Sequence, residues 1–241
     1  MTNCVNPAEI AHYHRDGYLV VRQIAPPADR DEIEKLLMDL FRRHHELPGK
    51  IAYELGKNKH EAGAAVTPQI IAPSKLEPRL LHTQYFRNAA AISRQLLGEE
   101  CYFKGDHAIY KPPHNNKATA WHQDLAYYAP GATGHVVNFW MPLRDCPVET
   151  GCMWFVPHSH FGDLWPHHPV GHDPAMHTLE TDGVDQGRAV ACPLSAGDAT
   201  LHTLKTLHYT GPNTSATPRL AYILAFGYEW TADGELQRAL P

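Results

Sequence analysis

The chain has 241 residues and a formal net charge of −5, with 43% hydrophobic and 20% charged residues. This length suits one large domain, and this composition can bury a hydrophobic core, which argues against intrinsic disorder. The 21 Lys and Arg residues form no basic stripe, which argues against a nucleic-acid partner. No apolar run approaches the ~20 residues that span a bilayer and no signal peptide is recognisable, so we expect a cytoplasmic protein without a membrane segment.

The N-terminal part of the chain is predicted to be mainly helical. An asparagine followed by a proline is typical of a helix start and predicts a short helix over residues 6–13, which leads into the strand-like run GYLVVRQI. Apolar residues at helical spacing predict a second helix over 27–43 and a third over about 88–97. Residues 48–78 show little periodicity, so we expect an irregular loop or lid there.

The second half of the chain reads as a series of short strands separated by glycine- and proline-containing turns. The strand-like runs after residue 100 are CYFKGDHAIY, VVNFWMPL, CMWFV, AVACPL, DATLHTL and LAYILAFGYEW. Many short strands after a helical segment predict a mainly β fold, a sandwich or a jelly-roll barrel with helices on one side. We expect a single domain over residues 1–241, with helical support and a lid in about 1–98 and the β-barrel core in about 99–241.

Histidine is unusually abundant, and 12 of the 18 histidines lie between His107 and His208. His122 and Asp124 are two residues apart, so on an extended strand their side chains point to the same face and can bind one metal ion. This pair alone is weak evidence in a histidine-rich chain, and His208 is the best candidate for a third ligand. Two histidines and one carboxylate leave three adjacent positions open on a non-haem Fe(II), enough for a cosubstrate and O₂.

The motifs around these residues resemble the phytanoyl-CoA dioxygenase family of Fe(II)- and 2-oxoglutarate-dependent oxygenases. The resemblance is carried by HQDLAYY at 122–128, ETGCMWFVPHSH at 149–160, GDATLHTLKTLHYTGPN at 197–213 and the arginine at 219. The N-terminal DGYLVV also fits, so most of the chain is covered. The resemblance implies a double-stranded β-helix, which is a cupin-like jelly roll, and oxidation of a C–H bond with Fe(II), 2-oxoglutarate and O₂.

The resemblance also implies roles for single residues. His122, Asp124 and His208 match the three ligands of the iron, and Arg219 matches the residue that binds the distal carboxylate of 2-oxoglutarate. A guanidinium suits that role because its planar fork donates two parallel hydrogen bonds to a carboxylate. His202 is expected to be a packed or supporting residue. Three further residues are expected in the cosubstrate pocket: Thr210, which stands in place of the usual serine, Gln123 and Trp140.

The residues expected to contact the substrate are His107, Tyr127, Tyr128, His158 and Tyr209. His158 and Tyr209 stand where the family commonly has glycine, so they are expected to reshape the substrate side. We also expect the histidines between 158 and 172 to lie in one long loop at the barrel mouth. The mixture of aromatic faces and polar tips favours a polar, ring-containing small molecule, for example a sugar-bearing natural product, over a long acyl chain. A solvent-facing position of these side chains is the alternative.

Three other functions share parts of this pattern. An acyl-CoA hydroxylase of the same family would keep every motif. A cupin-type metalloenzyme without 2-oxoglutarate would share the barrel and the histidines but would not need Arg219. A catalytically inactive sensor would have no need of an intact triad. Because Asp124 occupies the position where related halogenases carry a small residue, the resemblance implies oxygenation or oxidative cyclisation and no chlorination. The sequence predicts no oligomeric state.

Overall fold

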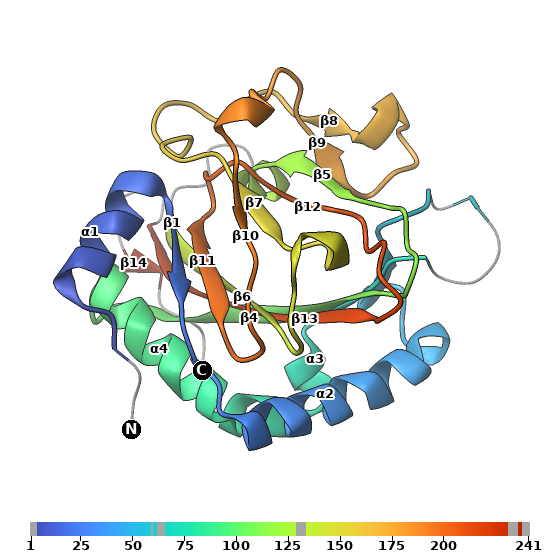
Figure 1. Cartoon of the computed structure of the whole chain (residues 1–241), viewed down its shortest axis with the longest axis horizontal. Coiled ribbons are helices and arrows are strands. Elements are labelled where there is room, and N and C mark those ends of the chain that lie inside the picture. Colours follow the sequence, from blue (N-terminus) through green and yellow to red (C-terminus); the bar gives the residue numbers. More distant parts are fainter. Residues whose placement is uncertain (1–3, 59, 62–65, 129–133, 231–235, 238–241) are drawn as a thin grey trace.

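A computed structural model describes residues 4–58, 60–61, 66–128, 134–230 and 236–237 of the chain. In this part of the chain two antiparallel sheets pack against each other, and the long helices cover the outer face of the larger sheet (Figure 1). This arrangement confirms the predicted mainly β, jelly-roll fold with helices on one side. The functional side chains described below lie between the two sheets.

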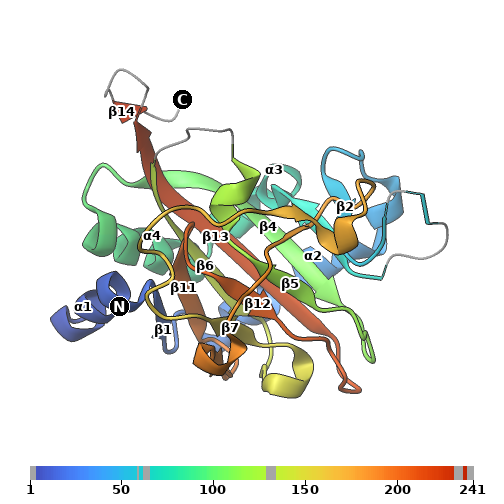
Figure 2. The ribbon, with the colours of Figure 1, turned by 90° about the horizontal axis from the view of Figure 1, so that it is seen from above.

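The large sheet has eight strands, and its long strand β13 lies between β4 and β6 (Figure 2). Its strands, in spatial order, are β1 (Tyr18–Val21), β11 (Ala199–Thr203), β6 (Gly134–Pro142), β13 (Arg219–Trp230), β4 (Tyr102–Lys111), β3 (Pro68–Ile71) and β2 (Ala52–Glu54), with β14 (Leu236–Gln237) paired to β13. The β4–β13 register places Arg219 opposite Lys111. This pairing joins two cationic residues that lie far apart in the sequence.

The small sheet has four strands that face the inner surface of the large one. In spatial order they are β10 (Val190–Cys192), β7 (Met153–Phe155), β12 (His208–Thr210) and β5 (Thr119–His122). A separate hairpin of β8 (His168–Pro169) and β9 (Leu179–Glu180) lies beside β5 (Figure 1). The connections contain short 3₁₀ helices: η1 (His44–Glu46), η2 (Pro78–His82), η3 (Asp124–Tyr127), η4 (Val148–Thr150), η5 (Val170–His172) and η6 (Gln186–Arg188).

The two faces of the large sheet have different neighbours, as strand β13 illustrates. Leu220, Tyr222 and Leu224 are buried in the core beneath the helices, whereas Ala221 and Ile223 belong to the second core, which includes side chains of the small sheet. Because successive side chains of a strand point to opposite faces, this alternation follows directly from the sequence of the run. The face of β13 that carries Ala221 and Ile223 therefore points toward the space between the two sheets.

The helices are α1 (Pro7–Asp16), α2 (Pro27–Arg42), α3 (Pro73–Leu76) and α4 (Gln84–Leu97). The first begins at a capping box, in which the side chain of Asn6 accepts from the Glu9 amide and the Glu9 carboxylate accepts from the Asn6 amide. It ends at Gly17, whose φ of 82° lies in the left-handed region that glycine adopts without steric cost. None of the helices in the described part of the chain combines the length and apolarity that a bilayer crossing requires.

Two parts of the N-terminal prediction need correction. The third helix begins at Gln84, earlier than expected, because Thr83 caps it by accepting from the Phe86 amide and Asp29 of α2 accepts from the amides of Gln84 and Tyr85. Residues 48–78 contain β2, β3 and α3, so the segment is not simply an irregular loop. Strands of three or four residues carry too little alternation to be recognised, and they are held in the sheet by pairing of β3 with β4 and of β2 with β3.

Replacing Asp29 with alanine is expected to destabilise the fold by about 1–2 kcal/mol, because two helix-end amides would lose their acceptor. The midpoint of thermal unfolding should fall by ~2–4 °C for each kcal/mol. Asp31→Ala removes the same charge from an exposed position of the same helix and is the matched control. Equal midpoints for the two variants would contradict this role of Asp29.

Candidate active site

The two histidines of the predicted triad face each other across the small sheet. His122 ends β5 and His208 begins β12, and the antiparallel register pairs them directly, with ring centroids 4.1 Å apart. Asp124 opens the 3₁₀ turn η3 immediately after β5, so its side chain returns to the same side as His122. Strand pairing thus brings the distant His208 to the local pair that the sequence identifies.

The donor atoms of this triad are close enough to share one metal ion. One donor from each of His122, Asp124 and His208 lies within 4.8 Å of the others. Oδ1 of Asp124 is 3.4 Å from Nε2 of His122 and 3.5 Å from Nε2 of His208. Ligands ~2.1 Å from a common metal and at right angles to each other are about 3 Å apart, so small side-chain shifts suffice for coordination.

Backbone carbonyls set the tautomer of both histidines. Nδ1 of His122 is 2.7 Å from the carbonyl oxygen of Ala120, and Nδ1 of His208 is 2.8 Å from that of Thr206. Because a carbonyl oxygen only accepts hydrogen bonds, each ring carries a proton on Nδ1, and Nε2 is the nitrogen that faces Asp124 and is available to a metal ion. This arrangement is typical of metal-binding histidines, whose second nitrogen is held by an acceptor.

The second oxygen of Asp124 is held by two further side chains. Nδ2 of Asn138 donates to Oδ2 at 2.6 Å, and Nε2 of His202 lies 3.2 Å from the same oxygen. Burial alone would raise the pKa of Asp124, but His208, His122 and His202 around it hold that pKa well below the usual range. The carboxylate is therefore ionised and oriented, with Oδ1 directed at the two triad histidines.

Asn138 was not predicted from the sequence, although it alternates with Trp140 on the inner face of β6. Replacing Asn138 with alanine should weaken metal binding by about 10- to 100-fold, because the carboxylate ligand loses its anchor. Anaerobic titration with Fe(II) measures this change. His135→Ala, at an exposed position of the same strand, is the control. An unchanged dissociation constant for Asn138→Ala would contradict a positioning role.

A cavity of about 690 Å³ extends from the triad between the two sheets. Most of the predicted site residues line it: His107, His122, Asp124, Tyr127, Tyr128, Trp140, His208, Thr210 and Arg219. Burial lowers the pKa of His107 to about 4, so this imidazole is neutral near pH 7 and can both donate and accept a hydrogen bond. The cavity thus combines a metal-ligand set with titratable and polar walls.

Arg219 is a buried cation without a partner in the described part of the chain. Only 3% of the residue is exposed, and none of its three side-chain nitrogens makes a hydrogen bond. The guanidinium lies 5.2 Å from the ring centroid of Trp140, and burial lowers its pKa to about 10, which still leaves it charged at pH 7. A buried, unpaired charge is costly, so this arrangement is best explained by an anionic ligand that completes it.

Lys111 is a second basic residue at this end of the site, and sequence reasoning missed it. It is fully buried opposite Arg219, and its Nζ donates to Oγ1 of Thr210 at 3.0 Å and to the carbonyl oxygen of Gly211 at 2.8 Å. Burial and the charge of Arg219 lower the pKa of Lys111 well below its usual range. Alternation along the strand-like run puts Lys111 on the same face as His107, which is the signal that could have found it. The lysine orients the hydroxyl of Thr210 at the cationic end of the site.

Gln123 does not line the cavity. Its Nε2 donates to the carbonyl oxygen of Lys205 at 2.6 Å, and its Oε1 accepts from the amide of Trp165 at 2.9 Å. Neighbouring residues of an extended segment point in opposite directions, so the side chain between His122 and Asp124 faces away from them. The expected contact with the cosubstrate is therefore replaced by a bridge between two loops.

His158 and Tyr209 also lie outside the cavity lining. The ring of His158 turns toward α1, with Nδ1 2.8 Å from the carbonyl oxygen of Arg15. Tyr209 stacks on Trp121 with ring centroids 5.2 Å apart, on the face of β12 opposite His208. Nor do the other histidines of 158–172 share one loop at the mouth, since His160 also contacts the end of α1 and His168 lies in β8.

Other parts of the cavity are lined by residues for which the sequence held no local signal. They come from β2 and the residue after it, from β3 and β4, and from the segment before β9: Tyr53, Leu55, Gln69, Ile71, Lys104, His177 and Thr178. The ring of Tyr53 packs edge-on against His177, which links the N-terminal strands to the hairpin segment. These contacts depend on how distant segments pack, and no spacing within one segment encodes them.

The sequence profile of the phytanoyl-CoA dioxygenase (PhyH) family matches residues 13–221. The chain belongs to this family. The predicted family is therefore confirmed, and Fe(II)- and 2-oxoglutarate-dependent oxygenation is the chemistry of the family. The matched range includes the triad, Arg219 and all four strands of the small sheet, and it ends within β13 of the large sheet.

Individual relatives agree with this assignment. Phytanoyl-CoA dioxygenase domain-containing protein 1 of Bos taurus is 31% identical over 137 residues, 54% of this chain and 47% of the relative. The chain spans about half the length of the first curated relatives it matches. The crystal structure of EvdO2 from Micromonospora carbonacea var. aurantiaca, complexed with 2-oxoglutarate, is 30% identical and superimposes with a TM-score of 0.80 over 100% of this chain and 96% of that chain.

A second solved structure shows the fold alone. The 2-oxoglutarate-dependent carbocyclase SnoK from nogalamycin biosynthesis is 18% identical, covers 92% of this chain and 84% of that chain, and has a TM-score of 0.71. Its fold therefore matches over most of both chains despite the low identity. The predicted jelly roll is confirmed by these neighbours as well as by the observed sheet order.

Proposed function

We propose that the chain is an Fe(II)- and 2-oxoglutarate-dependent oxygenase that oxidises a C–H bond of a polar small molecule, by hydroxylation or oxidative cyclisation. Residues 1–241 would act as one unit around a single catalytic site. The observation that carries the proposal is the combination, in one cavity, of a His-Asp-His triad with a buried guanidinium that has no hydrogen-bond partner in the described part of the chain.

His122, Asp124 and His208 would hold the iron. Two neutral imidazole nitrogens and one carboxylate are the ligand set of non-haem Fe(II) sites with three open positions. Iron with 2-oxoglutarate and O₂ supplies the oxidising power that removes a hydrogen atom from the substrate. The carbonyl oxygens of Ala120 and Thr206 hold the two rings, and this fixes the direction in which each Nε2 atom would meet the metal.

Arg219 and Thr210 would bind the distal carboxylate of 2-oxoglutarate, with Lys111 holding the hydroxyl of Thr210 in place. The guanidinium supplies two parallel donors and a full charge, and it lies in a buried environment where charge-assisted hydrogen bonds are strong. A cupin-type enzyme that does not use 2-oxoglutarate would leave this buried cation uncompensated. The unpaired Arg219 therefore favours the 2-oxoglutarate enzyme over that alternative.

The remainder of the cavity supports a polar substrate. Tyr127 and Tyr128 line the same cavity as the triad, and the neutral His107 adds a donor and an acceptor. Tyr53 and Gln69 add polar groups to the cavity lining, to which His158 and Tyr209 do not contribute. A ring-containing, oxygenated molecule matches these groups better than a long acyl chain does, because each polar wall group needs a hydrogen-bond partner. We therefore propose a tailoring enzyme of natural-product biosynthesis.

Substrate-stimulated release of succinate tests this function. The purified protein is incubated with Fe(II), ascorbate, 2-oxoglutarate and O₂, together with either glycosylated and polyhydroxylated metabolites or acyl-CoA compounds. We expect stimulation by members of the first group and no chlorinated product in chloride buffer. Stimulation by acyl-CoA compounds alone would overturn the substrate proposal, and a lack of 2-oxoglutarate turnover with every compound would count against the enzyme itself.

A further inference from the structure

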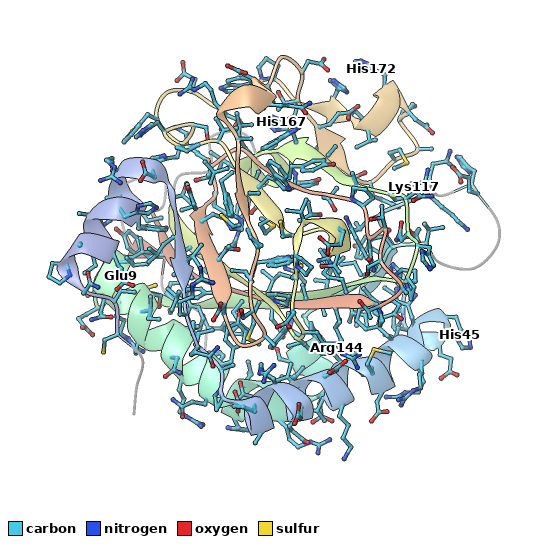
Figure 3. All side chains as sticks on the ribbon, viewed as in Figure 1. Glu9, His45, Lys117, Arg144, His167 and His172 are labelled. Atoms are coloured by element: carbon cyan, nitrogen blue, oxygen red, sulfur yellow. The ribbon has the colours of Figure 1, made fainter. Side chains whose placement is uncertain are left out.

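The β8–β9 hairpin carries a second group of metal-ligand side chains, outside the cavity. His168, His172 and Asp182 each offer a donor atom, and these atoms lie within 4.8 Å of one another. Figure 3 shows His172 beside β8 at the outer surface of the molecule. None of the three residues lines the cavity that contains the triad. The group is therefore a candidate for separate metal chemistry.

The side chains of this group are in direct contact with one another. Nε2 of His168 lies 3.0 Å from Oδ2 of Asp182. The rings of His168 and His172 stack with centroids 3.7 Å apart and an angle of 14° between their planes. An imidazole lone pair lies in the plane of its ring, so the two rings would have to rotate out of this stack to direct their nitrogens at a common ion.

A neighbouring carboxylate supports the turn that carries His172. Oε1 of Glu180 accepts from the amide of Gly171 at 2.6 Å and lies 3.8 Å from Nδ1 of His168. Carboxylates that hold a metal-binding histidine or its backbone are common partners of metal sites, because they fix the orientation of the ligand. His168 and His172 thus lie before β9 and Asp182 lies after it, while Glu180 within β9 contacts both His168 and the turn that carries His172.

We propose that His168, His172 and Asp182 form a second divalent-cation site, selective for a borderline transition-metal ion such as Zn²⁺ or Ni²⁺. Two imidazoles and one carboxylate favour such ions over Mg²⁺ or Ca²⁺, which prefer oxygen ligands. His172 and Asp182 are exposed, so water completes the coordination and the affinity is lower than that of a closed structural site.

The hairpin position connects this second site with the substrate cavity. His177 and Thr178, between the two strands, line the cavity, and the amide of Leu179 donates to the hydroxyl of Tyr127 at 2.8 Å. The ion would join His168 and His172, which precede this segment, to Asp182, which follows it. Metal binding at the hairpin would therefore order one wall of the cavity.

Calorimetric titration with ZnSO₄ tests the proposal on tag-free, chelator-treated protein. The unmodified chain should bind two Zn²⁺, one at the triad and one at the hairpin, whereas His172→Ala and Asp182→Asn should each retain only the triad ion. In a His122→Ala/His208→Ala background one Zn²⁺ should remain, and adding His172→Ala should raise its dissociation constant by roughly tenfold or more. This background variant lacks two of the three triad ligands, so Zn²⁺ bound at the triad cannot be mistaken for Zn²⁺ bound at the hairpin.

His45→Ala is the matched control, because this exposed histidine also lies next to a carboxylate, Glu46, yet sits far from the hairpin (Figure 3). It should leave both zinc affinities unchanged. Hydrogen exchange gives a second readout: Zn²⁺ should slow exchange over residues 177–181 in the background variant and should not do so once His172 is replaced. Equal zinc binding with and without His172 and Asp182, or the absence of a second equivalent in the unmodified chain, would overturn the proposal.

Discussion

Replacing His208 with alanine is expected to abolish turnover and to weaken Fe(II) binding by about 100-fold or more. The metal would lose one of three protein ligands, which costs more than loss of a supporting residue, itself worth roughly 10- to 100-fold. The ring of His208 also packs 4.1 Å from that of His122, so its loss leaves the facing imidazole without its partner across the strands. Anaerobic iron titration and succinate release measure the two effects separately.

His202 provides the matched control for this prediction. It is buried like His208 and also contacts Asp124, but through Oδ2 and not through the oxygen shared by the triad histidines. His202→Ala should therefore lower iron affinity without removing the site, and some turnover should remain. If His208→Ala kept full activity while His202→Ala lost it, the assignment of the third ligand would be wrong.

Replacing Arg219 with lysine should raise the KM for 2-oxoglutarate by about 10- to 100-fold while iron binding stays unchanged. Lysine keeps the charge but loses the planar fork, and a hydrogen bond to a charged group contributes ~1.5–3 kcal/mol. At 25 °C each 1.4 kcal/mol corresponds to about tenfold in affinity. The KM is measured from initial rates at saturating substrate, with the iron dissociation constant measured in parallel.

Thermal unfolding offers a readout of Arg219 that does not require turnover. Because 2-oxoglutarate would compensate a buried charge, it should stabilise the unmodified protein by about 2.7 kcal/mol at a concentration 100 times its dissociation constant. The same concentration should shift the midpoint of Arg219→Lys much less. Arg144→Lys makes the same change at a surface position paired with Glu34 and should behave like the unmodified chain (Figure 3). An unchanged KM in Arg219→Lys would mean that another basic residue, with Lys111 the nearest candidate, binds the carboxylate.

The sequence by itself predicted the class of fold and singled out His122, Asp124 and His208 as candidate iron ligands. Alternation along the strand-like runs assigns the side chains of β13 to its two faces, and a spacing of two residues brings His122 and Asp124 to one side of the chain. These are local properties, because the direction of a side chain on a strand depends only on its neighbours. The position of Arg219 was likewise readable, since it follows the third ligand within a recognisable motif.

Only the tertiary structure decided how these segments meet. The pairing of Lys111 with Arg219 and the contact of Asn138 with Asp124 depend on the register between strands that are distant in the sequence. The same alternation that exposes Asp124 to the cavity turns Gln123 away, but which side faces the cavity is known only once the second sheet is in place. Register and sheet packing follow from the burial of both faces at once, and no single segment contains that information.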